Sequence, residues 1–203
     1  MSIENDLRPI HRIVLAATVD VVAAVAGEDL SLPTPCAGWD LAALLAHMTV
    51  QHRGFAAAAR GAGDDLAIWQ PETVTDAVVA DPAGAYRAAV ADVLDAFAGL
   101  DSLERSVVLP ELGGAAPASL AIGFHLVDYV VHGWDVAAAL GRRYEPSAEV
   151  VAATVPLAFE VPDGDYRAAA TSPFGPALPV PGQAGDFERI LAHLGRDPRW
   201  HSA

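Results

Sequence analysis

The sequence predicts a mainly α-helical protein built as a four-helix bundle. Three observations favour this fold class. Four long stretches repeat apolar side chains at three- and four-residue steps, alanine is abundant in a chain that is 53% apolar, and Pro/Gly-containing segments separate these stretches. Helices of this kind joined by loops pack as bundles, and 203 residues are expected to form a single domain.

The predicted bundle helices cover residues 5–26, 39–60, 81–100 and 117–141. Local signals mark their ends. Gly27 follows the first helix and Gly61 the second, while Asp81 and Pro82 provide a cap and a first-turn proline for the third. Residues 62–80, between the second and third helices, are expected to form a loop.

Shorter elements lie between and after the bundle helices. Residues 106–110 are expected to be a short strand or an extended segment, and Gly113 marks a turn. A further helix at 147–159 is expected to be bent or interrupted by Pro156, and a last helix spans residues 186–194.

A Pro/Gly-rich extension forms the C-terminal part of the chain. Residues 161–185 are expected to be loop with a short strand pair. The tail beyond them is apolar enough to pack rather than extend into solvent. The predicted organisation is therefore a bundle of residues 1–160, with residues 161–203 packed on it.

Charge and composition argue against several classes of protein. The net charge is −14 and the chain has no lysine, which disfavours nucleic acid as a partner. A membrane span and a signal peptide are not expected, so the predicted location is cytoplasmic and the predicted partner a small molecule. Cys36 is the only cysteine, so a metal would bind histidine and carboxylate side chains. A homodimer is compatible with this composition.

A polar stripe interrupts the apolar face of the fourth predicted helix. His125, Asp128 and His132 lie within roughly 60° of one another around the helix axis. Asp128 and His132, four residues apart, can bind one divalent ion if another helix supplies a third ligand, or they can simply hydrogen-bond each other in the core. His47 faces inward from the second helix and is either that third ligand or a core histidine.

Other polar residues receive more ordinary interpretations. His125 is a fourth ligand, a proton shuttle or, as the favoured interpretation, a hydrogen-bond partner behind the metal ligands. His52 is expected near the bundle end or in solvent. Arg196 is interpreted as a surface residue rather than an anchor for an anionic substrate. Cys36 is interpreted as structural, because no histidine lies next to it in sequence.

Three segments carry a resemblance to a known family: TPCAGWD (residues 34–40) followed by LLAHM (44–48), DYVVHGWD (128–135), and GRDPRW (195–200). They resemble actinobacterial metal-binding proteins of the DinB-like superfamily, in the branch related to mycothiol-dependent maleylpyruvate isomerase. The resemblance implies a DinB-like four-helix bundle that holds one divalent metal, usually zinc, near one end.

The resemblance also implies a ligand set of His47, Asp128 and His132. The isomerases carry Glu where this chain has Asp128. Because Asp is one methylene shorter, either the helices approach more closely or the carboxylate binds through water.

The implied function is that of a mycothiol-dependent thiol transferase or isomerase. In such an enzyme zinc activates a thiolate, or water, toward an electrophilic small molecule. Two alternatives remain. One is a metal-containing binding or stress-response module without turnover, and the other is a structural helical protein with a metal-free polar core.

Overall fold

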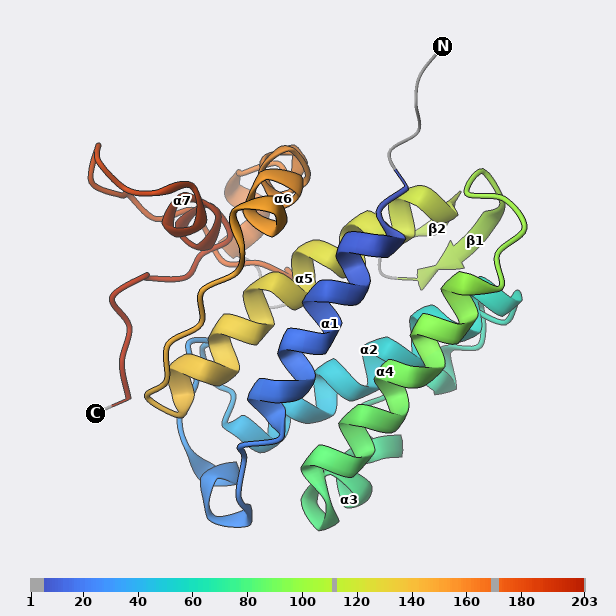
Figure 1. The fold of residues 1–203 in the computed structure, drawn as a ribbon, viewed down its shortest axis with the longest axis horizontal. Helices are drawn as coiled ribbons and strands as arrows, with labels where there is room; N and C mark the ends of the chain where they lie inside the picture. The colour runs from blue at the N-terminus through green and yellow to red at the C-terminus, as the bar shows by residue number, and fades with distance from the viewer. Residues whose placement is uncertain (1–5, 111–112, 169–171, 203) are drawn as a thin grey trace.

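The computed structural model describes residues 6–110, 113–168 and 172–202. Its centre is a bundle of four helices: α1 (Arg8–Val22), α2 (Leu41–Arg60), α4 (Pro82–Ala98) and α5 (Ala118–Ala139). Helix α1 lies between α4 and α5 on one face of the bundle, and α2 packs against α4 and α5 behind it (Figure 1). The predicted mainly α-helical fold is confirmed.

Capping residues fix where the helices begin and end. The Asp40 side chain accepts a hydrogen bond from the Ala43 amide (2.9 Å), and Asp81 does the same for Gly84 (2.8 Å). Gly61 ends α2 in a left-handed conformation (φ +91°) that a residue with a Cβ rarely adopts. The helix boundaries predicted from these signals agree with the structure to within a few residues.

The loop prediction for residues 62–80 was wrong. This range contains a 3₁₀ turn, η2 (Leu66–Trp69), and helix α3 (Glu72–Ala80). Val74 and Val78, one turn apart, bury α3 against the bundle, and Trp69 packs into the space beside α2. A single apolar pair is too short a pattern to reveal a helix from sequence.

The strand pair forms in the middle of the chain. Strand β1 (Ser106–Leu109) confirms the expected strand, and it pairs antiparallel with β2 (Gly114–Pro117), with Leu109 opposite Gly114. The prediction of a strand pair within 161–185 is not confirmed by the described part of that range. In that range, the described residues 161–168 and 172–185 contain no strand.

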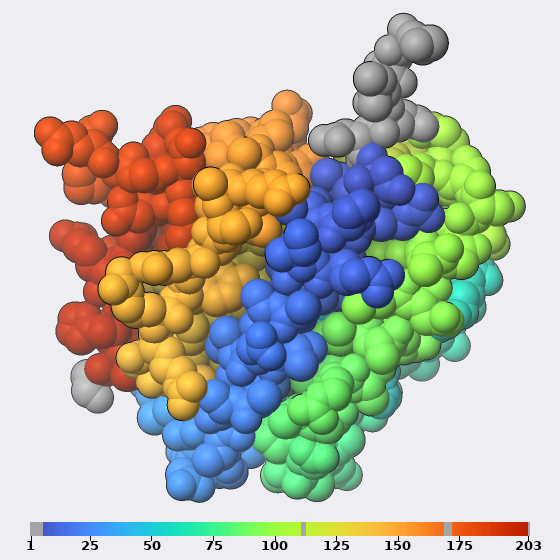
Figure 2. Space-filling view, viewed as in Figure 1, coloured from blue at the N-terminus to red at the C-terminus, as the bar shows by residue number. Residues whose placement is uncertain are grey.

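The C-terminal part adds α6 (Ala148–Glu160), the 3₁₀ turn η4 (Asp165–Ala168) and α7 (Asp186–His193). Helix α6 continues through Pro156 rather than breaking there. Ile190, Leu191 and Leu194 share an apolar cluster with Val127 and Val131 of α5, so the end of the chain packs against the bundle. Figure 2 shows this segment along one side of the molecule, beside the surface of α6.

None of the described helices combines the length and the apolar character that a membrane crossing needs. The longest, α5, carries buried histidine and aspartate side chains instead.

Candidate metal centre

The three predicted ligands converge from two helices. His47 comes from α2, while Asp128 and His132 lie one turn apart on α5, and one donor atom of each lies within 4.8 Å of the others. The Nε2 atom of His132 is 3.2 Å from Oδ1 of Asp128. Two ligands of a tetrahedral zinc ion lie about 3.4 Å apart. This spacing therefore suits a shared ion, although the ligand role itself stays a prediction.

The shorter Asp128 reaches the site directly. Its carboxylate touches the imidazole of His132, and the His47 ring meets the same imidazole edge-on, with the ring centroids 5.2 Å apart. Asp128 and His132 belong to the same helix, so both arrangements that the sequence left open for an aspartate stay predictions.

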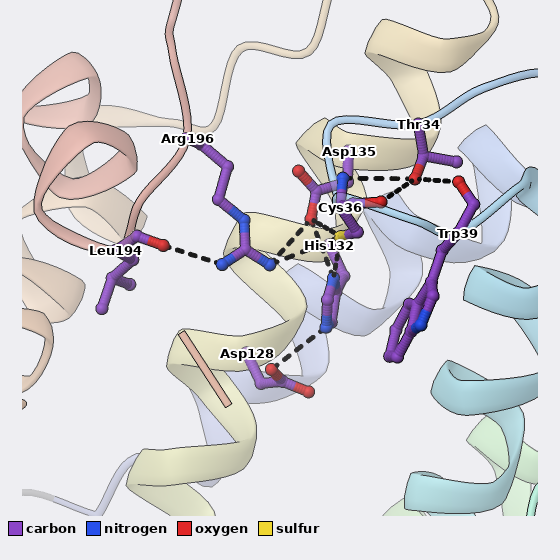
Figure 3. A network of polar contacts seen from close by, with 8 residues as sticks. All are labelled: Thr34, Cys36, Trp39, Asp128, His132, Asp135, Leu194 and Arg196. Atoms are coloured by element: carbon purple, nitrogen blue, oxygen red, sulfur yellow. Dashed lines mark hydrogen bonds and ion pairs between the residues drawn. The ribbon is translucent and has the colours of Figure 1, made fainter. Parts of the chain in front are cut away.

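A second carboxylate orients His132 from behind. The Nδ1 atom of His132 lies 2.9 Å from Oδ2 of Asp135, which is fully buried, and the opposite ring nitrogen faces Asp128 (Figure 3). A hydrogen bond from Nδ1–H to Asp135 leaves the lone pair on Nε2, where a metal would bind. Asp135 is a site residue that the sequence prediction missed, although its i, i+3 spacing from His132 is a usable signal.

The electrostatics of the three residues suit a cation. Burial, with the nearby His132, lowers the pKa of His47 to about 4, so this imidazole is neutral and has a free lone pair. Burial opposes charge on Asp128, but His132 outweighs it and lowers the pKa of Asp128 to about 2. Burial likewise disfavours a charged His132, yet Asp128 and Asp135 raise its pKa well above the ordinary value. Without an ion, a proton on His132 supplies the positive charge between these carboxylates.

Arg196 and Cys36 lie beside the His132–Asp135 pair, contrary to expectation. Arg196 is only 6% exposed, and its Nη2 atom is 3.2 Å from Oδ2 of Asp135. The Sγ atom of Cys36 lies 3.2 Å from the same oxygen and 3.9 Å from Nδ1 of His132. The surface interpretation of Arg196 was therefore wrong, because α7 folds the tail back over α5. A histidine does adjoin Cys36, but it comes from a distant part of the chain.

Cys36, His132 and Asp135 form a second group with metal-ligand chemistry. In this group, however, the guanidinium of Arg196 already stands against Asp135 and supplies the balancing positive charge. Among the described residues, no arginine stands at hydrogen-bond distance from His47 or Asp128, so the first group is the better candidate for a metal.

His125 belongs to a different network from these donor atoms. Its Nδ1 lies 2.8 Å from Nε2 of His11, and its Nε2 lies 3.1 Å from Nδ1 of His52. Both ring nitrogens therefore face other imidazoles rather than the three predicted ligands. His52 is completely buried, so its predicted position near the bundle end or in solvent was wrong.

A cavity of about 820 Å³ opens in front of the three donors. His47, Asp128 and His132 all line it, together with aromatic side chains from α2, η2, α5 and the C-terminal segment. Its size is that of a small-molecule site. Part of its wall comes from residues beyond 160, which brings the C-terminal extension into the candidate site.

Comparisons with known proteins agree with this architecture. Residues 11–137 match the family model described as "Mycothiol maleylpyruvate isomerase N-terminal domain". The crystal structure of the mycothiol-dependent maleylpyruvate isomerase shares the fold with a TM-score of 0.62 at 16% sequence identity, over 80% of this chain and 73% of that one. A histidine-to-alanine mutant of that enzyme gives 0.58 at 15% identity, with the same coverage.

Similar sequences also occur in Mycobacterium tuberculosis. Uncharacterized proteins from two strains of this organism are each 27% identical to the chain over 194 residues. The alignment covers 93% of this chain and 97% of each relative, so the likeness includes the C-terminal extension.

Proposed function

Because this chain belongs to the family of the mycothiol maleylpyruvate isomerase N-terminal domain, we propose that it is a metal-dependent thiol transferase or isomerase that uses mycothiol. The observation that carries the proposal is the convergence of His47, Asp128 and His132 at the wall of one cavity. The proposal includes zinc as the ion, a DinB-like bundle as the scaffold and the cytoplasm as the location.

The residues present fit a divalent ion. Two imidazoles and one carboxylate are typical zinc ligands, and three protein ligands leave a position open for a substrate atom. Zinc bound there would lower the pKa of a thiol and hold it as a thiolate. Asp135 fixes the His132 ring so that Nε2 points at the other two donors.

The size of the cavity limits which electrophiles can reach such a thiolate. Asp128 and His132 line a cavity of about 820 Å³, which leaves room for a small electrophile. In a transfer reaction the sulfur forms a bond to an electrophilic carbon, and either a leaving group departs with its electron pair or the adduct takes up a proton. In an isomerisation the same carbon–sulfur bond breaks again after rotation, which returns the thiolate.

The experiment is a thiol-consumption assay with mycothiol, zinc and a broad panel of electrophiles. We expect metal-dependent consumption that falls by more than about 100-fold in the His132→Ala variant. The His201→Ala variant, which removes an exposed histidine far along the tail, should match the parent. Zinc binding without thiol consumption across the panel would instead favour the non-catalytic binding module.

A further inference from the structure

We propose that the electrophile taken by this cavity is an uncharged, largely apolar molecule rather than a carboxylate-bearing one. The inference rests on the proposed function and names the substrate class of the same site. Three features of the described cavity wall support it: the aromatic side chains, the two guanidinium groups that are already hydrogen-bonded, and the two carboxylates of Asp128 and Glu160.

Aromatic side chains from separate parts of the fold make up much of the wall. They are Trp39, Phe55, Trp69, Phe124 and Phe174. Rings of this kind gain free energy by covering apolar ligand surface and offer no partner to an anion apart from the indole N–H groups. The indole of Trp69 already donates its N–H to the Gly63 carbonyl (3.0 Å).

Arg196 cannot readily receive a carboxylate. Its Nη1 donates to the Leu194 carbonyl (2.8 Å), and its Nη2 donates to Asp135 (3.2 Å). The Phe174 ring lies against the guanidinium at 5.7 Å, and the Nε–H, which has no partner among the described residues, is buried away from solvent. The charge of Arg196 is therefore balanced by Asp135, and both of its terminal nitrogens already donate to protein acceptors (Figure 3).

Arg167 is committed to the backbone of the C-terminal segment. It is 2% exposed and donates to the carbonyls of Val161 (2.9 Å), Pro162 (2.8 Å) and Gly175 (3.3 Å), and to that of His193. A substrate carboxylate would have to displace these carbonyls from a buried guanidinium. In the part of the chain that the structure describes, Arg167 and Arg196 are the arginines of the cavity wall, and the chain contains no lysine.

The cavity wall also carries two carboxylates. Asp128 lines it beside His132, and the exposed Glu160 contributes to it at the end of α6. In the proposed site, Asp128 and a bound thiolate together balance the charge of a divalent ion. A ligand carboxylate would therefore lose its hydration without gaining a free cation.

A matched pair of ligands tests this inference without thiol or turnover. Methyl 1-naphthoate and 1-naphthoate share a ring system and differ in charge, and their binding can be followed by quenching of tryptophan fluorescence, since Trp39 and Trp69 line the cavity. We expect the ester to bind at least about 10-fold more tightly, both with and without zinc. Equal or tighter binding of the carboxylate in either form, or no binding of the ester, would overturn the inference.

Two variants link the preference to this cavity. Phe124→Ala should weaken binding of the ester by about 10-fold, whereas Phe159→Ala, an exposed ring on α6 outside the cavity wall, should leave it unchanged. Glu160→Gln should lower the ratio of carboxylate to ester dissociation constants by about 2-fold. Glu149→Gln, on the same helix but away from the cavity, should leave this ratio unchanged. Unchanged binding in both cavity variants would contradict the assignment.

The experiments distinguish a wrong substrate class from a wrong proposed function. Loss of thiol consumption with the ester preference intact would leave an apolar binding site without chemistry. Thiol consumption with a preference for carboxylate electrophiles would keep the enzyme and overturn the substrate class.

Discussion

His132 is the residue on which the candidate site depends. It touches Asp128 through one ring nitrogen and Asp135 through the other, and its ring also meets that of His47. Helical spacing within α5 predicted the pairing with Asp128, and the same spacing could have revealed Asp135. Arg196 could not be placed this way, because its position against Asp135 depends on how the tail folds back from α7.

Replacing Asp135 tests how the His132 ring is held. In Asp135→Asn the amide can donate to Nδ1, which moves the ring proton to Nε2 and blocks the metal-binding lone pair. We expect the zinc affinity to fall by about 10- to 100-fold in competition with a chromophoric chelator. Asp197→Asn, an aspartate of the tail that pairs with Arg199, is the control and should bind zinc like the parent. An unchanged affinity in Asp135→Asn would refute the orienting role.

The buried chain of His11, His125 and His52 predicts a pH dependence of stability. Burial lowers the pKa of His11 to about 3 and those of His52 and His125 well below the ordinary value. In the unfolded chain each titrates near 6.5, so below about pH 6.5 the unfolded state binds protons that the folded state does not. These three histidines should therefore lower the free energy of unfolding as the pH falls from about 6.5 toward 3.

Denaturant titrations at a series of pH values, with a chelator present, check this prediction. The His11→Phe variant removes one of the linked groups. Between pH 6 and 4, the slope of its unfolding free energy against pH should therefore be smaller than that of the parent by about 1.4 kcal/mol per pH unit. The His201→Phe variant, altered at an exposed position, should keep the parental slope. If the unfolding free energy of the parent, His11→Phe and His201→Phe proteins had the same slope against pH, His11 would not be held neutral in the folded state.

At the scale of elements, sequence patterns identified the long helices and missed the short ones. The bundle helices carry repeated apolar steps, and caps such as Asp40 and Asp81 mark their beginnings. Helix α3 was missed because only Val74 and Val78 are buried in it. Its position depends on tertiary packing against α2 and α4, which no local pattern records.

The contact between α2 and η2 predicts that Gly54 does not tolerate a side chain. A Cβ at this position would lie 2.3–2.5 Å from ring atoms of Trp69. Alanine favours a helix by about 0.5–1 kcal/mol over glycine, but overpacking costs about 1–3 kcal/mol. We expect Gly54→Ala to lower the free energy of unfolding by about 1–2 kcal/mol in urea titrations.

Gly27→Ala is the matched control for that experiment, since no atom lies within 4 Å of the added Cβ and its backbone angle is ordinary. Its stability should stay close to that of the parent. A stabilised Gly54→Ala variant would mean that Trp69 does not pack against α2 as described.

At the scale of the whole molecule, the C-terminal extension completes the cavity. Sequence analysis predicted that residues 161–203 pack on the bundle, yet it could not predict how. The range 161–185 has no helical periodicity, and its buried Arg167 makes its shortest contacts with backbone carbonyls, which no side-chain pattern in the sequence reveals. The four carbonyls bound by Arg167 come from the start of the extension, from Gly175 and from the end of α7, so one side chain links these parts of the segment.

Arg167→Met should loosen this segment selectively. Methionine fills part of the space but leaves the buried carbonyls without donors, which costs about 1–3 kcal/mol for each unsatisfied group. In hydrogen exchange we expect faster exchange across α7 and the residues around it, with α2 and α5 close to parental rates. Arg189→Met, which removes an exposed arginine of α7, serves as the control. Equal acceleration in α2 and α5 would show that the extension is not a separate local unit.

The central claim is that His47, Asp128 and His132 together hold one divalent ion. The most direct test is elemental analysis of metal per chain after zinc loading and gel filtration, for the parent and for the His47→Ala, His132→Ala and His201→Ala variants. The account predicts one zinc per chain in the parent and in His201→Ala, and loss of zinc from the other two while they remain folded. Zinc retained at one per chain in folded His132→Ala, or absent from the folded parent, would contradict it.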